Sequence, residues 1–393
     1  MVEGAMGSGP TSRTLLYVVN SYDFFLSHRL SLARAAQEQG FSVAVASPWH
    51  PDAGSDPTIT HVTIPCSRRG INPFAEARTL FAIHAAFRRI QPDVVHLLTM
   101  KPIMYGGIAA RFHRSKVAVV QAVTGLGYLF SENTLRAKTL RIIAKAGLRF
   151  ALNQPNGHVI FQNQDDQATL IDARLTDLGT SSLIRGSGVN PEEYRFSPEP
   201  RGPPIVLMAS RLLWSKGLEE FIEAARILND RGDPTRFQLA GKLDPGNPSS
   251  ASEDQLIRWT KEGIIEYIGW IEDMNRAYQD VHIVCLPSKY GEGVPKALIE
   301  AAACGRPIVT TDTPGCRDIV LDGYNGRLVP IRDAAALADA IQDLSSNPRL
   351  RQKYGLAGRQ RVIDSFASDI VHAETMEIYE KLLGASHEPN QSS

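Results

Sequence analysis

The sequence predicts an α/β protein with two doubly wound, parallel-sheet domains that face each other across a cleft. Three observations carry this prediction. The chain has 393 residues, which is too long for one ordinary hydrophobic core and suits two domains. Short β-branched apolar runs alternate with amphipathic helical stretches, which is typical of parallel strands joined by crossover helices. This alternation restarts after about residue 187.

The first half of the chain contains five short apolar runs that we expect to be buried strands. They are 15–19, 41–46, 94–98, 118–120 and 159–161. Between the first two runs, residues 29–39 have the spacing of an amphipathic helix, and Gly40 is placed to end it. We therefore expect an N-terminal domain over residues 13–187.

The second half repeats the pattern. The expected strands are 205–209, 237–241, 265–268, 283–287 and 307–310, with a helix at 218–229. Four prolines between Ser197 and Pro204 predict an inter-domain linker. We expect a C-terminal domain over residues 188–368. The carboxyl ends of both sheets would then line one cleft, where ligands of such domains bind.

Composition excludes several classes of protein. Hydrophobic residues make up 43% and charged residues 21% of the chain, as in soluble globular proteins. Lysine plus arginine equals aspartate plus glutamate, at 42 each, so we expect no nucleic-acid partner. The four cysteines are scattered, which argues against a zinc site or a disulfide framework and fits a reducing cytosol. No apolar run reaches about 18 residues, so we expect no transmembrane helix.

The segment 291–305 is the most informative stretch for chemistry. Gly291 and Gly293 let the backbone approach a ligand just ahead of a predicted helix N-terminus, which is a favourable place for an anion. Glu292 lies in this loop, and Glu300 lies in the apolar helix, where a carboxylate is costly without partners. A surface pair of Lys296 with Glu300 would explain a lone acid. The acid–seven residues–acid spacing after a strand favours a binding site instead.

A second segment, 209–217, ends a predicted strand and contains Arg211 and Lys216. Together with Glu292 and Glu300, it resembles the E-x7-E glycosyltransferases of family 4. These are retaining enzymes with the GT-B fold, which consists of two Rossmann-like domains facing a cleft. The resemblance implies that Glu292 reaches the donor sugar, Glu300 binds the ribose hydroxyls, and Arg211 and Lys216 bind the pyrophosphate.

The same resemblance adds further donor-site positions and extends from about residue 15 to residue 383. It implies that the backbone of Gly293, Val294 and Pro295 lies beside the sugar and phosphates. It also implies donor contacts from Ser210, Gly241 and Ile271 at the ends of neighbouring strands. It further implies front-face attack with retention of anomeric configuration, and a final helix at 369–385 that crosses back onto the N-terminal domain.

The charge that develops on the leaving nucleoside diphosphate must be stabilised. Many transferases use a divalent metal bound by a D-x-D motif, and no D-x-D occurs in this sequence. Arg211, Lys216 and a helix N-terminus can supply the positive field instead. We therefore expect no divalent metal and no cofactor.

Three N-terminal segments, 24–29, 99–107 and 124–127, resemble a narrower subgroup. These are bacterial transferases that extend sugars on undecaprenyl pyrophosphate, including alpha-1,3-N-acetylgalactosaminyltransferases. The resemblance implies a lipid-linked saccharide acceptor, with a soluble acceptor as the alternative. It also implies a UDP-sugar as the donor substrate, with UDP-N-acetylhexosamine expected and UDP-galactose, UDP-glucose or a GDP-sugar as the alternatives. Residues 20–23 depart from the paired glycines of many family members. The candidate sugar-side residues are His28, His96, Lys101, Thr124, Gly125 and Gly127, with His96 also a catalytic candidate.

Residues 134–153 combine five basic residues with apolar ones and contain no acid. The basic residues are Arg136, Lys138, Arg141, Lys145 and Arg149. A basic amphipathic helix of this type can lie on anionic lipid headgroups, and an ordinary helix with a solvated basic face is the alternative. With a lipid-linked acceptor, we expect a cytoplasmic protein that is peripheral on the inner membrane.

Three rival functions are less compatible with the sequence. A GT-B-fold UDP-sugar 2-epimerase would turn over the donor without an acceptor. A NAD-dependent dehydrogenase would need a G-x-G-x-x-G turn, and the turn after Val19 has no glycine. A non-catalytic sugar-binding module would be indicated by loss of Lys216 or Glu292, and both are present.

Overall fold

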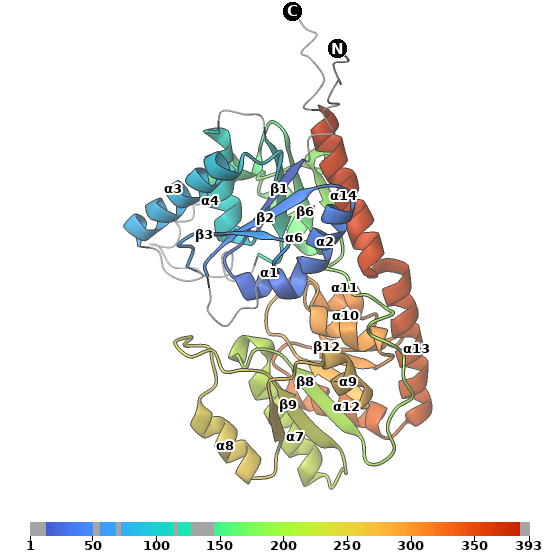
Figure 1. The fold of residues 1–393 in the computed structure, drawn as a ribbon. Helices are drawn as coiled ribbons and strands as arrows, with labels where there is room; N and C mark the ends of the chain where they lie inside the picture. The colour runs from blue at the N-terminus through green and yellow to red at the C-terminus, as the bar shows by residue number, and fades with distance from the viewer. Residues whose placement is uncertain (1–12, 50–55, 68–71, 114–116, 127–144, 386–393) are drawn as a thin grey trace, which may run out of the picture.

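The computed structural model describes residues 13–49, 56–67, 72–113, 117–126 and 145–385. Figure 1 shows two α/β domains, one above the other, each built on a sheet with helices packed against it. The described strand pairs within both sheets are parallel. The predicted pair of doubly wound sheets is therefore confirmed.

The N-terminal sheet has seven strands in the order β3-β2-β1-β4-β5-β6-β7. The strand order reverses between β1 and β4, which defines the switch point where ligands of such sheets bind. The strands are β1 (Thr14–Val18), β2 (Ser42–Ser47), β3 (Thr60–Thr63), β4 (Val94–Leu98), β5 (Ala118–Val123), β6 (Gly157–Phe161) and β7 (Ser181–Leu183). The helices are α1 (Tyr22–His28), α2 (Leu30–Glu38), α3 (Pro73–Ile90), α4 (Met100–Arg111), a helix at 145–152, and α6 (Gln164–Asp172).

The C-terminal sheet has six strands in the order β10-β9-β8-β11-β12-β13, with its reversal between β8 and β11. The strands are β8 (Ile205–Ala209), β9 (Arg236–Ala240), β10 (Glu266–Gly269), β11 (Ile283–Leu286), β12 (Ile308–Thr311) and β13 (Gly326–Val329). The helical elements are η3 (Trp214–Lys216), α7 (Leu218–Asp230), α8 (Glu253–Lys261), α9 (Met274–Gln279), α10 (Lys296–Ala303), α11 (Cys316–Ile319), α12 (Ala334–Ser345) and α13 (Pro348–Ser365).

The strands that the sequence revealed are the central ones of each sheet and one edge strand, β10. All positions of β4 and β5 are buried, as expected for strands covered on both faces. The sequence did not reveal β3, β7 and β13, which lie at sheet edges and are short or polar. It also did not reveal α1, whose N-cap is Ser21, with a side chain that accepts a hydrogen bond from the Phe24 amide.

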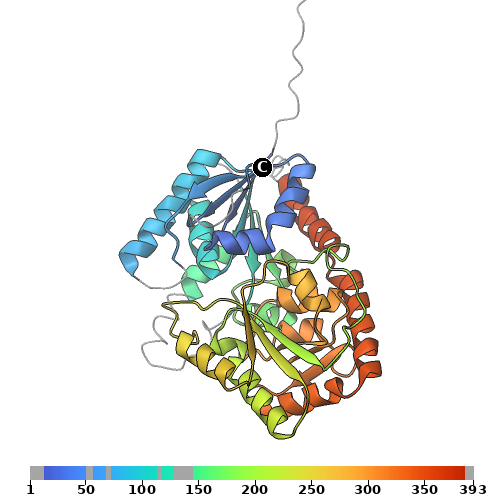
Figure 2. The same cartoon turned by 60° about the horizontal axis from the view of Figure 1, so that its bottom comes forward.

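The last helix, α14 (Ser368–Ala385), follows α13 and packs against α2 and β5 of the N-terminal domain. Figure 2 shows it running from the lower domain to the upper one. An ion pair of 2.7 Å between Arg13 and Glu380 joins the start of the chain to this helix. The four cysteines are free and buried. Within the described ranges, no helix combines the length and apolarity needed to cross a membrane.

Candidate active site

The loops that follow β8 and β11 lie side by side because a glycine permits their close approach. Gly217, just after η3, has φ of 80°, and a Cβ at this position would lie 1.8 Å from the Pro287 carbonyl oxygen. Only glycine adopts this conformation at low cost and fits against the neighbouring backbone. Lys216 is therefore fixed beside the loop that contains Glu292.

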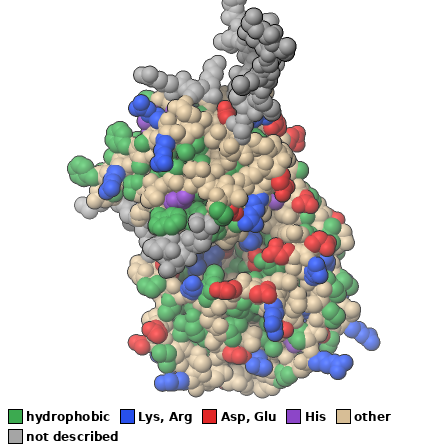
Figure 3. All heavy atoms as spheres, in the orientation of Figure 1, with side chains coloured by type: hydrophobic (Ala, Val, Ile, Leu, Met, Phe, Trp, Pro, Cys, Tyr) green, Lys and Arg blue, Asp and Glu red, His purple; other side chains and the backbone are tan. Residues whose placement is uncertain are grey.

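Lys216 and Glu292 form an ion pair through Nζ and Oε2, and both side chains are largely buried. The other Glu292 oxygen, Oε1, accepts a hydrogen bond of 2.8 Å from Ser288 Oγ. Lys216, which is predicted to bind the pyrophosphate, and Glu292, which is predicted to bind the sugar, are therefore in direct contact. Figure 3 shows charged side chains around a hollow where the two domains meet.

Glu300 is buried in α10, and both of its carboxylate oxygens accept hydrogen bonds from tyrosines. Tyr194 Oη donates to Oε1 at 2.9 Å, and Tyr278 Oη donates to Oε2 at 3.2 Å. Lys296 Nζ also lies 3.2 Å from Oε1. The pair with Lys296 is present, but it is not the exposed surface pair of the simpler interpretation. Burial, together with the Glu300 charge, raises the pKa of both tyrosines above the ordinary range, so they remain neutral donors.

The loop of the E-x7-E segment contacts the N-terminal domain through its backbone. The Gly293 amide donates to the Thr124 carbonyl at 3.1 Å, and a Cβ on Gly125 would lie 2.9 Å from the Gly293 nitrogen. Asn163 at the start of α6 is fully buried and donates from Nδ2 to the Glu292 carbonyl at 3.1 Å. The predicted donor loop and the predicted acceptor loop therefore touch. Helix α10 begins at Lys296, and Pro295 is its N-cap.

The remaining donor candidates lie at the ends of β8, β9 and β10. Arg211 is half-exposed, and its Nη1 lies 3.5 Å from Asp244 Oδ2. Gly241 has φ of 139°, and a Cβ there would lie 1.8 Å from the Ser210 carbonyl, so these two predicted positions are in contact. Ile271 is partly buried against the C-terminal core. The next residue towards the N-terminus, Trp270, is exposed, with Lys242 Nζ 4.7 Å from its ring centroid.

His28 ends α1 on the side that faces the C-terminal domain. Lys296 Nζ donates to the carbonyl of the preceding residue, Ser27, at 2.8 Å. Ser27 Oγ donates to the Asp23 carbonyl at 2.7 Å, so we assign the proton of the His28–Ser27 hydrogen bond, 2.7 Å long, to His28 Nδ1. Burial, and then the Lys296 charge, lowers the pKa of His28 to about 3. His28 is therefore a neutral imidazole whose Nε2 is a hydrogen-bond acceptor.

Two further predicted sugar-side residues have side-chain partners in α14 and α3. His96 is the third residue of β4 and is buried beneath α14. Its Nδ1 lies 2.5 Å from Tyr379 Oη, and burial lowers its pKa well below the ordinary value. Lys101 forms an ion pair of 2.5 Å with Glu76 of α3. The side chains of His96 and Lys101 thus contact Tyr379 and Glu76, and their part in sugar binding stays a prediction.

Some predicted positions lie outside the described residues, namely Gly127, Arg136, Lys138 and Arg141. Of the basic stretch, Lys145 and Arg149 lie in the helix at 145–152, where Arg149 is exposed and Leu148 is buried. The role of this stretch at a membrane stays a prediction.

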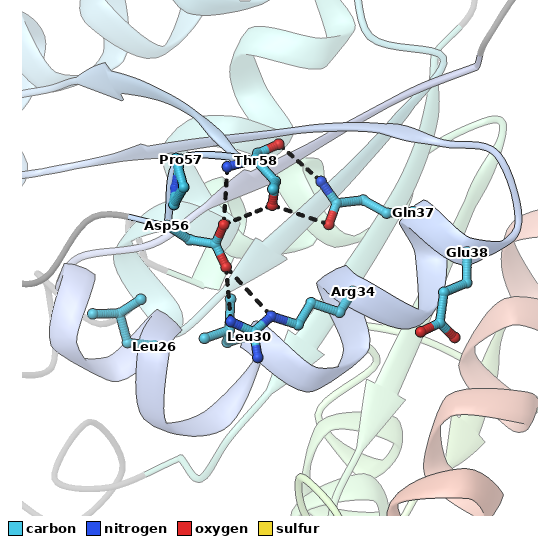
Figure 4. Close-up of a pocket in the computed structure, with 8 residues that line it drawn as sticks. All are labelled: Leu26, Leu30, Arg34, Gln37, Glu38, Asp56, Pro57 and Thr58. Atoms are coloured by element: carbon cyan, nitrogen blue, oxygen red, sulfur yellow. Dashed lines mark hydrogen bonds and ion pairs between the residues drawn. The ribbon is translucent and has the colours of Figure 1, made fainter.

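A separate hollow lies between α1, α2 and residues 56–58 (Figure 4). Its polar groups bind one another: Arg34 Nη2 lies 3.0 Å from Asp56 Oδ2, and Asp56 Oδ1 accepts from the Thr58 amide. None of the predicted site residues lines it. We assign it no part in the reaction.

Sequence reasoning missed the partners of the two acids. Ser288, Tyr194, Tyr278 and Asn163 all contact Glu292 or Glu300. Of these four partners, only Ser288 could have been found from the sequence, because it follows β11 and lies four residues before Glu292. Within the described part of the chain, no group of three or more His, Cys, Asp and Glu side chains could hold a metal ion.

Two family models match this chain over the two domains just described. "Glycosyl transferases group 1" matches residues 190–361, and "Glycosyl transferase 4-like" matches residues 14–163. The chain is a group 1, family 4-like glycosyltransferase. The resemblance seen in the E-x7-E segment and the predicted enzyme class are thus confirmed.

Relatives of this glycosyltransferase span most of its length. It is 26% identical over 330 residues to N,N'-diacetylbacillosaminyl-diphospho-undecaprenol alpha-1,3-N-acetylgalactosaminyltransferase of Campylobacter jejuni, covering 81% of this chain and 84% of the relative. It is 27% identical over 381 residues to phosphatidyl-myo-inositol mannosyltransferase of Mycobacterium leprae, covering 90% and 92%.

Solved structures share the fold of this glycosyltransferase. Sucrose-phosphate synthase from Thermosynechococcus elongatus superimposes with a TM-score of 0.77 at 21% identity, covering 95% of this chain and all (100%) of that one. Anabaena HepE in complex with UDP and glucose gives a TM-score of 0.72 at 19% identity, covering 93% and 99%. The chain therefore has the GT-B fold.

Proposed function

We propose that this glycosyltransferase is retaining and metal-independent, and that it transfers an N-acetylhexosamine such as GalNAc from a UDP donor to a polyprenyl-pyrophosphate-linked saccharide. One observation carries the proposal. The Lys216–Glu292 ion pair lies next to the Gly293–Thr124 contact, so the donor loop and the acceptor domain meet at the same point.

The donor chemistry follows from the exchange of partners at this pair. A bound pyrophosphate would compete with Glu292 for the Lys216 ammonium, because phosphate oxygens form strong charge-assisted hydrogen bonds. Glu292, still oriented by Ser288 at 2.8 Å, would then be available to the sugar hydroxyls. The half-exposed Arg211 is held only by an ion pair of 3.5 Å, so it can turn towards the phosphates at little cost.

Two cations and the N-terminus of α10 would stabilise the charge on the departing UDP. This arrangement supports the proposed metal independence. Glu300 would accept hydrogen bonds from the ribose on the lone pairs that its tyrosines leave open. His28 Nε2, a neutral acceptor at the cleft, would accept a hydrogen bond from a sugar hydroxyl.

The names of the relatives support a lipid-linked acceptor. The Campylobacter jejuni relative is named for an undecaprenol-diphosphate substrate, and the Mycobacterium leprae relative for phosphatidyl-myo-inositol. The structural neighbour HepE binds UDP and glucose in its crystal, which supports UDP as the carrier. We accordingly place the enzyme at the cytoplasmic face of the inner membrane.

The test is a donor screen with a synthetic polyprenyl-pyrophosphate-linked saccharide. We expect product with UDP-GalNAc or another UDP-N-acetylhexosamine, an α-linked anomeric proton in its NMR spectrum, and an unchanged rate in EDTA. A β-linked product would refute retention, and a rate abolished by EDTA and restored by Mg²⁺ would refute metal independence. Transfer only to water-soluble saccharides would refute the lipid-linked acceptor. Conversion of UDP-sugar without any acceptor would indicate an epimerase.

A further inference from the structure

Helix α3 of the N-terminal domain presents an unusual apolar ridge to solvent. Phe74 and Phe81 have 87% and 71% of their surface exposed, and they are seven residues apart, which is two helical turns. They therefore lie in line on the face opposite the buried residues Thr79, Ile83 and Phe87. Single exposed aromatic residues are common, but two in line on one helix mark an interaction surface.

Three exposed arginines accompany this ridge. Arg88 lies seven residues after Phe81 and continues the line, and Arg78 and Arg89 lie beside it on the exposed surface. None of these three arginines has an ion-pair partner among the described residues. Figure 3 shows hydrophobic and basic side chains side by side at the outer edge of the upper domain, where Figure 1 has α3.

The only acid of α3 lies on the opposite side of the helix. Glu76 pairs with Lys101 of α4 at 2.5 Å and so is turned towards the domain. The exposed face of α3 therefore combines apolar rings with positive charge and contains no negative charge. This contrasts with the chain as a whole, which has a formal net charge of zero.

We propose that α3 lies flat on an anionic bilayer, with Phe74 and Phe81 among the headgroups and Arg78, Arg88 and Arg89 bound to lipid phosphates. The proposal rests on the lipid-linked acceptor proposed above and assigns its membrane contact to a surface separate from residues 134–153. The charge of the exposed face of α3 indicates its partner, because a positive face with an apolar ridge fits an anionic lipid surface. An apolar protein partner would not require the arginines.

A third exposed phenylalanine lies near α3, on the neighbouring helix. Phe112, at the C-terminal end of α4, is 69% exposed. The next residue, His113, packs against His84 of α3, with ring centroids 6.3 Å apart. Phe112 is therefore a third exposed ring close to the second half of α3.

The test is flotation of the purified full-length enzyme with vesicles of phosphatidylcholine alone or with about one-third phosphatidylglycerol. We expect binding to the anionic vesicles, little binding to the neutral ones, and release by high salt. Each arginine near an anionic surface should change the partition coefficient roughly fivefold, so Arg78→Gln/Arg88→Gln/Arg89→Gln should lower it about 100-fold. Phe74→Ser/Phe81→Ser should lower it by at least about tenfold.

Helix α13 of the other domain supplies the matched controls. Leu356 and Ile363 are also seven residues apart and are 49% and 41% exposed, and Arg349 and Lys353 are exposed basic residues on the same helix. Leu356→Ser/Ile363→Ser and Arg349→Gln/Lys353→Gln should leave the partition coefficient within about twofold. Because all these side chains are exposed, the melting temperatures should remain close to that of the parent.

Three outcomes would overturn the proposal. They are equal recovery with neutral and anionic vesicles, α3 variants that bind like the parent, and a dimer in solution that Phe74→Ser/Phe81→Ser abolishes. The assay contains neither donor nor acceptor, so it can fail while the proposed transferase activity stands. If binding is seen but no UDP-sugar is transferred to any lipid-linked acceptor, the proposed function fails and the membrane face stands.

Discussion

Replacing Glu300 with glutamine should weaken UDP-sugar binding while the fold is kept. Glutamine has the same shape, and its carbonyl oxygen can still accept from Tyr194 or Tyr278. The remaining amide can donate to the other tyrosine oxygen, which is both donor and acceptor. The substitution removes the negative charge that Lys296 faces at 3.2 Å and that the ribose hydroxyls would meet.

The expected loss follows from the two kinds of hydrogen bond. A bond to a charged group contributes about 1.5–3 kcal/mol, and a neutral bond about 0.5–1.5 kcal/mol. The difference of about 1.4 kcal/mol corresponds to roughly a tenfold loss in kcat/KM for the donor. The free energy of unfolding should change by no more than about 1–2 kcal/mol, because no buried group is left without a partner.

Calorimetric titration with UDP separates the ribose contact from the sugar contact. UDP has no donor sugar, so Glu300→Gln should weaken UDP binding about as much as it lowers kcat/KM. Glu292→Gln serves as the comparison variant, because Glu292 is expected to contact the sugar. It should lower kcat with a smaller effect on UDP binding. Near-normal kcat/KM and UDP affinity in Glu300→Gln would refute the assignment of Glu300 to the ribose.

Three further predictions concern Lys216, Gly125 and Asp166. Lys216→Ala removes the ammonium beside Glu292 and should lower kcat/KM by at least about tenfold in steady-state assays; a near-normal rate would remove Lys216 from the donor site. Gly125→Ala introduces a Cβ 2.9 Å from the Gly293 nitrogen and should lower kcat by at least about tenfold. Gly202→Ala, at a similar φ of 119° with no atom within 4 Å, controls for backbone strain, and equal losses in both would contradict the contact. Burial raises the pKa of Asp166 from 3.8 to about 6, so its contribution to stability is lost as pH rises from about 4 to about 6. The free energy of unfolding of Asp166→Asn, measured by denaturant titration, should therefore exceed that of the parent by about 1–3 kcal/mol at pH 7.5 and equal it near pH 4. A difference that is independent of pH would contradict this reasoning.

Local patterns predicted much of this fold. The central strands were visible because burial on both faces makes them continuous apolar runs, as in β4 and β8. The edge strand β7, with the sequence Ser-Ser-Leu, has no such run and takes its conformation from pairing with β6. Side-chain placement was less predictable. His96 lies in the expected strand 94–98 and Lys101 follows that strand at the start of α4, yet their side chains contact Tyr379 and Glu76, which the sequence pattern did not indicate.

The sequence by itself determined the two doubly wound sheets and the residues of the predicted donor loop. Periodicity and spacing are local properties, and Glu292 and Glu300 are only eight residues apart. The tertiary structure decided what surrounds these groups. Tyr194 reaches Glu300 from 106 positions away, and the contact of His96 with Tyr379 spans 283 positions. Burial, which neutralises His28 and raises the pKa values of the tyrosines, depends on packing between such distant segments. For that reason, the chemical state of the site could not be predicted from the order of its residues.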